Sequence, residues 1–132
     1  MKVLKNVMLV DDDYATNYLH QLFLEESERV ENIMVAKSAD EALSILKDGL
    51  ATENIPEIIF LDINLPAKNG WEFIDEYSEI VGEASKNSKV IMLSTSENPR
   101  DMEKSKEYKL IKEYRIKPLS VPIINEIVDK YF

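Results

Sequence analysis

Apolar and polar residues follow two alternating patterns along this chain. Short runs of consecutive apolar residues, typical of strands buried on both faces, alternate with stretches where apolar residues recur every three or four positions, the spacing of one helix face. The predicted strands are residues 6–10, 32–36, 58–61, 89–93 and 110–116. The predicted helices are residues 14–26, 38–50, 71–81, 100–108 and 121–132.

The run Ile58–Leu61 is the strongest of these signals. It consists of large apolar residues between Pro56 and Pro66, too short for a helix and too apolar for a surface strand. It therefore predicts a central parallel strand. Asp62 follows at once, where the chain turns toward the next helix, and open α/β sheets keep their sites at that edge.

Strands and helices that alternate in this way predict an α/β fold, a doubly wound five-stranded parallel sheet with helices on both faces. Each crossover between parallel strands is right-handed and needs a helix to return the chain. The last strand, 110–116, mixes charged with apolar residues, which favours an edge strand with one face in water. A length of 132 residues suits one domain, and we expect residues 1–132 to form it without an output domain.

The first predicted helix has one apolar stripe, and we expect this stripe to face the core. Its members are Ala15, Leu19, Leu22 and Phe23. Asp13, just before the helix, is expected to cap it. His20 is the only histidine of the chain and lies off the stripe, so we expect it to be exposed and without a phosphohistidine role.

Composition excludes several classes of function. The net charge of -9, from 25 acidic and 16 basic residues, disfavours nucleic acid as a partner. The chain has no cysteine, so disulfides, thiol nucleophiles and thiolate zinc sites are excluded. No apolar run approaches a membrane span and the start lacks signal-peptide features, so we expect a cytoplasmic protein without a membrane partner.

Polar side chains gather where the predicted strands end. Because the ends of parallel strands share one edge of a sheet, residues far apart in sequence converge there. The residues at the ends of strands one, three, four and five are Asp11, Asp12, Asp62, Ser94 and Lys117. Together they form a site of three carboxylates, a hydroxyl and an ammonium group.

This set of groups suits Mg²⁺ and phosphoryl transfer. Clustered carboxylates repel one another, and Mg²⁺ removes that cost while it takes carboxylate, water and phosphoryl oxygens as ligands. With the metal and Lys117 neutralising phosphoryl oxygens and Ser94 donating to another, one aspartate can attack phosphorus in line. Asp62 is the predicted nucleophile.

The motifs at these positions resemble those of the receiver domain of two-component response regulators, and the resemblance covers essentially the whole chain. They are Val10-Asp11-Asp12, Leu61-Asp62-Ile63-Asn64-Leu65-Pro66 with Gly70 beyond it, Leu93-Ser94, and Tyr114 three residues before Lys117-Pro118. The resemblance implies the flavodoxin-like (βα)5 receiver fold with strand order 2-1-3-4-5.

The resemblance also implies a role for each matching residue. Asp62 falls on the phospho-acceptor, Asp12 on the carboxylate that binds Mg²⁺ directly, and Asp11 on the neighbour that holds the metal through water. Asn64 falls on the residue whose backbone carbonyl is a metal ligand, and Asp62 completes the metal site.

The remaining matches concern the phosphoryl group and the switch. Lys117 falls on the lysine that pairs with the phosphoryl group, within a Lys117-Pro118 peptide that is usually cis in the family. Ser94 falls on the hydroxyl residue that turns inward to bond the phosphoryl group, and Tyr114 on the aromatic switch. Thr95 departs from the family, which commonly has Ala or Gly there, so access to the site and the lifetime of the phosphoryl group stay open.

The implied function is that of a stand-alone response regulator, a monomer or weak dimer that catalyses its own phosphorylation and dephosphorylation. The implied partners are a sensor histidine kinase or histidine phosphotransfer protein and a downstream protein target. A phosphorelay intermediate that passes the phosphoryl group onward is the nearest alternative. A degenerate receiver, a small phosphatase using Asp11 and Asp13, and a flavodoxin-like FMN binder are the others.

Overall fold

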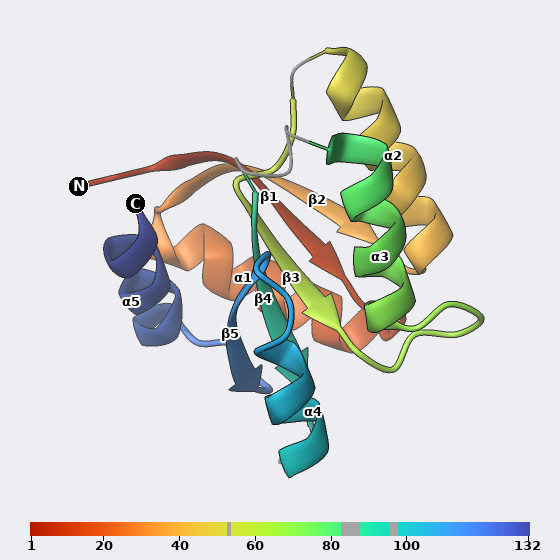
Figure 1. Ribbon diagram of the computed structural model, residues 1–132. Helices are drawn as coiled ribbons and strands as arrows, with labels where there is room; N and C mark the ends of the chain where they lie inside the picture. Colours follow the sequence, from red (N-terminus) through yellow and green to blue (C-terminus); the bar gives the residue numbers. More distant parts are fainter. Residues whose placement is uncertain (53, 83–87, 96–97) are drawn as a thin grey trace.

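Five strands and five helices alternate along the protein, as Figure 1 shows. The computed structural model describes residues 1–52, 54–82, 88–95 and 98–132. The strands are β1 (Leu4–Val10), β2 (Val30–Ala36), β3 (Ile58–Asp62), β4 (Lys89–Ser94) and β5 (Ile111–Ile116). The helices are α1 (Tyr14–Ser27), α2 (Ala39–Ala51), α3 (Gly70–Val81), α4 (Pro99–Ser105) and α5 (Val121–Tyr131).

The strands form one parallel sheet in the order β2-β1-β3-β4-β5, which confirms the predicted fold class and strand order. All five residues of β3 are buried, as expected for the central strand. β5 lies at one edge, as its mixed sequence predicts. β2 lies at the other edge, and its weak apolar signal fits its mostly exposed or half-buried residues.

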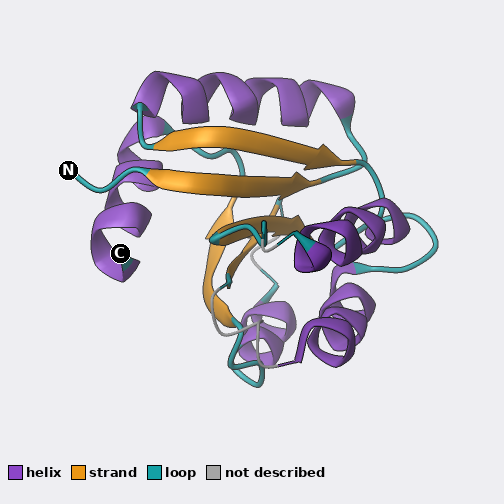
Figure 2. Ribbon diagram, turned by 90° about the horizontal axis from the view of Figure 1, so that it is seen from above, coloured by secondary structure: helices purple, strands orange, loops and turns teal. Residues whose placement is uncertain are grey.

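Successive residues of the inner strands pack on opposite faces of the sheet, so every residue of an apolar run is buried. In β3, Ile59 and Leu61 join the core cluster under α2 and α3, whereas Ile58 and Phe60 join the cluster under α1 and α5. Figure 2 shows helices on both sides of the strands. No helix in the described part of the chain is long and apolar enough to cross a membrane.

Side-chain caps set the starts of the helices. Asp13 accepts a hydrogen bond from the Thr16 N–H at 3.1 Å, which confirms it as the cap of α1. At α3, Asn69 and Glu72 form a reciprocal capping box. α4 ends at Ser105, three residues earlier than predicted, because the chain continues there in a turn rather than in helical hydrogen bonds.

The prediction for the inner face of α1 is wrong for three of its four residues: Phe23 packs against the core, but Ala15, Leu19 and Leu22 are exposed. The buried residues of this helix are Asn17, His20, Leu24 and Ser27. Leu19 and Leu22, placed in the core by the sequence pattern, are 39% and 43% exposed, and His20 is only 1% exposed. The helix turns its polar side inward because Asn17 and His20 hydrogen-bond to backbone groups at the ends of two strands.

Candidate functional site

Three carboxylates meet at the carboxyl edge of the sheet, the edge to which the strand arrows in Figure 1 point. Asp11 and Asp12 follow β1, and Asp62 ends β3, its neighbour in the sheet. One oxygen from each lies within 4.8 Å of the others. Asp11 and Asp62 are buried, whereas Asp12 is exposed, so the cluster opens to solvent on one side.

Lys117 reaches this cluster from the end of β5, the edge strand that lies two strands away from β3. Its Nζ lies 2.6 Å from Oδ2 of Asp11 and 3.5 Å from Oδ1 of Asp62. The lysine follows β5, and its backbone N–H donates to the Ser94 carbonyl at 2.8 Å. One ammonium group is thereby shared between two carboxylates that belong to different strands.

The electrostatics of Asp62 show that this sharing leaves its charge incompletely balanced. Burial raises the pKa of the Asp62 carboxyl above its usual value, Lys117 opposes that rise, and the nearby Asp11 carboxylate adds to it. Hard divalent cations prefer clustered carboxylate oxygens of this kind. The donor set of Asp11, Asp12 and Asp62 therefore fits Mg²⁺, as the sequence predicts.

Backbone amides orient the two buried carboxylates. The Asp13 N–H donates to Oδ1 of Asp11 at 2.9 Å, and the Asn64 N–H donates to Oδ1 of Asp62 at 3.3 Å. Asp13 itself lies outside the metal-ligand group, and hydrogen bonds from Thr16 hold the pKa of its carboxyl below the usual value. Asp13 is therefore a helix cap and not a member of the cluster. Asn64 is held beside the cluster by its N–H bond to Asp62.

Gly70 allows the loop after β3 to close tightly against Asp62. Its N–H donates to the Ile63 carbonyl at 2.8 Å. A Cβ atom at this position would lie 2.8 Å from the Asp62 carbonyl oxygen, which is closer than Cβ atoms approach non-bonded atoms in real proteins. The glycine eight residues past Asp62 is thus explained by a close backbone approach rather than by a turn conformation.

Ser94 lies at the carboxyl edge of the sheet beside the cluster, whereas Tyr114 lies further back within β5. Ser94 is 1% exposed and ends β4, the strand beside β3, so it reaches the carboxyl edge. Tyr114 pairs with Met92 within the β4–β5 ladder and is half-buried. It lines a cavity of about 480 Å³ between α4 and β5. The predicted cis peptide between Lys117 and Pro118 is present.

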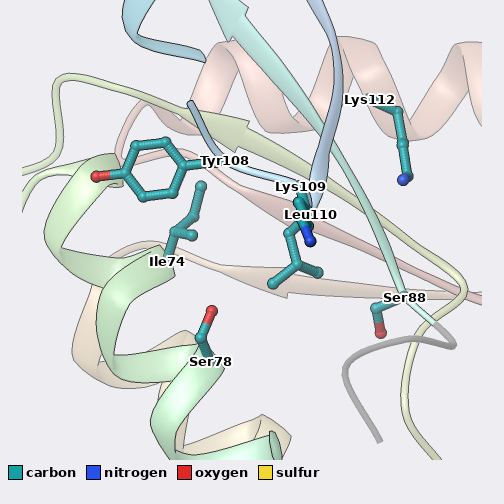
Figure 3. Close-up of a pocket in the computed structure, with 7 residues that line it drawn as sticks. All are labelled: Ile74, Ser78, Ser88, Tyr108, Lys109, Leu110 and Lys112. Carbon is teal, nitrogen blue, oxygen red and sulfur yellow. The ribbon is translucent and has the colours of Figure 1, made fainter. Parts of the chain in front are cut away.

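A second cavity, of about 380 Å³, lies at the opposite edge of the sheet, near the start of β4. Figure 3 shows its lining residues, Ile74, Ser78, Ser88, Tyr108, Lys109, Leu110 and Lys112. Among the residues that the structure describes, no carboxylate lines it, and Ser88 precedes β4 whereas Ser94 ends it. The carboxylates that the sequence predicts for phosphoryl chemistry therefore lie at the carboxyl edge of the sheet and not in this cavity.

Two residues of α1 lie beside the site without a role assigned to them from the sequence: Asn17 is not among the predictions, and His20 is predicted to lie in solvent. Asn17 donates from its side chain to the Asp11 carbonyl at 2.8 Å, and Nε2 of His20 accepts from the Leu119 N–H at 3.2 Å. Both are buried on α1. Their separation of three residues places them on one helix face, but the apolar pattern points to a different face.

Comparison with known proteins agrees with this geometry. The model of the response regulator receiver domain matches residues 7–129. Response regulator Rcp1 of Synechocystis sp. is 32% identical over 110 residues, which cover 74% of this chain and 67% of Rcp1.

Two solved structures extend the comparison. A two-component response regulator from Cytophaga hutchinsonii is 33% identical with a TM-score of 0.93, and the match covers 98% of this chain and 97% of that one. The phosphorylated cyanobacterial phytochrome response regulator RcpA is 29% identical with a TM-score of 0.75, over 96% of this chain and 89% of its own. The chain belongs to the response regulator receiver domain family of two-component signalling.

Proposed function

We propose that this receiver accepts a phosphoryl group on Asp62 from the phosphohistidine of a sensor histidine kinase or histidine phosphotransfer protein. The observation that carries the proposal is the shared ammonium group of Lys117, 2.6 Å from Asp11 and 3.5 Å from Asp62. A buried carboxylate with a raised pKa, a cation and two further carboxylates together provide a nucleophile and a metal site.

In this proposal Asp12, Asp62, the Asn64 carbonyl and, through water, Asp11 would hold Mg²⁺. When bound, the ion neutralises the carboxylates and the oxygens of the incoming phosphoryl group. An Asp62 carboxylate oxygen attacks phosphorus as the bond from phosphorus to the donor histidine nitrogen breaks, and the imidazole leaves with that electron pair. The product is an acyl phosphate on Asp62.

The same step gives Lys117 and Ser94 new partners. Lys117 exchanges the Asp11 carboxylate, its nearest partner, for a phosphoryl oxygen only a short side-chain movement away. Ser94, at the end of the adjacent strand, donates its hydroxyl proton to another phosphoryl oxygen. Both contacts depend on the phosphoryl group, so they are the start of a conformational signal.

We propose that Tyr114 carries this signal to a protein-binding surface formed by α4, β5 and α5. The cavity between α4 and β5 gives the half-buried ring space to move. Coupling between such a site and a partner surface typically amounts to about 1 to 3 kcal/mol. With a net charge of -9, a protein target fits this surface better than nucleic acid does.

A second surface faces the phosphoryl donor. Tyr14, Tyr18 and Leu22 are 71%, 56% and 43% exposed on the side of α1 opposite its buried face. The helix begins with Tyr14, two residues after Asp12, and Tyr18 and Leu22 follow one and two turns further along the same exposed side. We propose that the histidine-bearing donor protein packs here, and Tyr18→Ala should slow transfer from that protein but not from acetyl phosphate.

The experiment that tests the proposed function is intact mass spectrometry after incubation with acetyl phosphate. Wild-type protein with Mg²⁺ should gain one labile phosphoryl group, and the gain should be absent in Asp62→Asn and after removal of metal with EDTA. An adduct of equal yield in Asp62→Asn would refute the assignment of the acceptor. Transfer of the adduct onward to a second histidine protein would identify the phosphorelay variant.

A further inference from the structure

The inward face of α1 is polar where it meets the site, and each polar group there contacts a strand end. Nε2 of His20 accepts from the Leu119 N–H at 3.2 Å, and both residues are 1% exposed. One turn earlier, Nδ2 of Asn17 donates to the carbonyl of Asp11 at 2.8 Å. A single turn of helix therefore contacts the chain beside Lys117 and beside the metal cluster.

The sheet alone does not fix the distance between these two points. β1 and β5 are separated by β3 and β4, so no ladder hydrogen bonds join the strand that carries Asp11 to the strand that carries Lys117. The ammonium group must nevertheless lie within a few ångströms of both Asp11 and Asp62. α1 supplies the missing connection, because it packs on the same face of the sheet as α5 and contacts both strand ends.

We infer that His20 is a positioning residue for phosphoryl transfer: by accepting the Leu119 N–H it fixes the turn that carries Lys117, while Asn17 fixes the end of β1. The inference rests on the proposed function and adds two hydrogen bonds made by α1 side chains that set the geometry of the site. It also explains why Asn17 and His20 of α1 face the core, although both lie off the apolar stripe predicted from the sequence.

The chemistry of the imidazole suits this role. To accept a hydrogen bond, Nε2 must be unprotonated, so the ring must be neutral with its proton on Nδ1. Burial, with a smaller contribution from the nearby Lys117, lowers the pKa of His20 to about 4, and Asp11 opposes the change. The ring therefore stays neutral at physiological pH and keeps the acceptor that Leu119 needs.

An apolar residue at position 20 would leave the Leu119 N–H without an acceptor. A buried unsatisfied amide costs about 1 to 3 kcal/mol, so the turn would shift to find another partner. Such a shift would move Lys117, two residues away. Misplacement of a reacting group by about 1 Å can reduce a rate by as much as about 100-fold.

The test compares two replacements of His20 with a matched control. His20→Gln keeps an acceptor that can take the place of Nε2, whereas His20→Met keeps an apolar side chain without an effective one. Ser27→Ala is the control, because Ser27 is buried on the same helix face but bonds to the Leu24 carbonyl and the Arg29 N–H, away from the site. Phosphorylation by acetyl phosphate with Mg²⁺ is followed as a function of donor concentration, and folding is checked by thermal melting.

We expect His20→Met to lower the maximal phosphorylation rate about 10-fold or more with little change in the half-saturating donor concentration. His20→Gln should restore most of the rate, and Ser27→Ala should melt earlier but react as the wild type does. A wild-type rate in folded His20→Met would overturn the positioning role. Failure of wild-type protein to react would instead refute the proposed function, so the two failures are distinguishable.

A measurement on the intact wild-type protein does not depend on any variant folding. Because the chain has one histidine, ¹⁵N NMR reports its imidazole alone. We expect a neutral ring with the proton on Nδ1 between about pH 5 and pH 8, and a shift of its signals when beryllofluoride and Mg²⁺ bind. A ring that titrates in this range, or that carries its proton on Nε2, would overturn the inference.

Discussion

Two cations at opposite ends of the sheet, the buried Arg29 and the half-buried Lys117, use their charge in different ways. Arg29, 2% exposed, donates to the Lys2 carbonyl at 2.8 Å, to the Asn125 side chain at 3.1 Å and to Asp129 at 2.6 Å. These partners are a carbonyl, an amide and a largely exposed carboxylate. Each of these groups accepts a hydrogen bond from a different nitrogen of the guanidinium, so no two of them share one donor nitrogen.

Lys117 is in the opposite situation, because Asp11 and Asp62 share one ammonium group and Asp62 retains a raised pKa. The difference separates a structural contact from a reactive one. At Arg29 each of the three guanidinium nitrogens donates to a separate protein group, so the loss of these bonds should cost stability. At Lys117 the charges are left to be balanced by a metal and a phosphoryl group, so a change should affect reactivity more than stability.

The largest expected effect on stability is at Arg29. Replacement by Met removes a buried cation that donates to the Lys2 carbonyl, the Asn125 side chain and Asp129. Hydrogen bonds to charged groups typically contribute about 1.5 to 3 kcal/mol. Urea denaturation of Arg29→Met should show a loss of this size, while the folded protein reacts with acetyl phosphate at the wild-type rate. Asp129→Asn is the matched control and should cost far less, because Asp129 is 69% exposed.

Gly70→Ala should affect both stability and reactivity, since the new Cβ would meet the Asp62 carbonyl at 2.8 Å. Overpacking of this kind usually costs about 1 to 3 kcal/mol. The backbone must shift at the acceptor itself, so the phosphorylation rate should fall as well. If denaturation and acetyl phosphate kinetics both match the wild type, the loop after β3 is not as tightly packed as described.

Asp62→Asn should raise the melting temperature at neutral pH. Because the pKa of Asp62 is raised in the folded state, mainly by burial, the folded carboxyl holds its proton at pH values where the unfolded one has lost it. Stability therefore falls as pH rises through that interval, and the charged form is the costly one. The advantage of the variant should disappear as pH is lowered below the ordinary value of 3.8, which melting at several pH values would show.

The smallest effect is expected at the end of α1 near Arg29. Glu28 ends the helix with a φ of 58°, in the left-handed region that glycine adopts without strain. Glu28→Gly should stabilise the protein by about 1 kcal/mol, measured by denaturation, and leave phosphorylation unchanged. A loss of stability would show that the Glu28 side chain has a role that the backbone does not reveal.

The sequence allowed prediction of the sheet and of the convergence at its carboxyl edge for a simple reason. The run Ile58–Leu61 is too short for a helix and lies between Pro56 and Pro66, so it indicates a strand covered on both faces. Parallel order then brings Asp11, Asp62 and Lys117 to one edge. Both steps depend on local patterns and topology alone.

The orientation of α1 could not be predicted in the same way. Apolar periodicity assumes that the inner face of a helix packs on apolar groups, whereas Asn17 and His20 face backbone N–H and carbonyl groups at strand ends. The partners of Arg29 are equally invisible in sequence, because Asn125 and Asp129 follow it by nearly a hundred residues. In both places polar contacts outside the helix's own hydrogen bonds, most of them with residues about a hundred positions away, determine which residues are buried.

The most direct test of this account measures phosphorylation rate and stability together in Lys117→Met and Arg29→Met. We predict that Lys117→Met is phosphorylated by acetyl phosphate at least about 100-fold more slowly while it loses much less stability than Arg29→Met. Arg29→Met should lose stability and keep its rate. If rate and stability instead fall in proportion in both variants, the two cations do not differ in kind, and Lys117 is a structural residue.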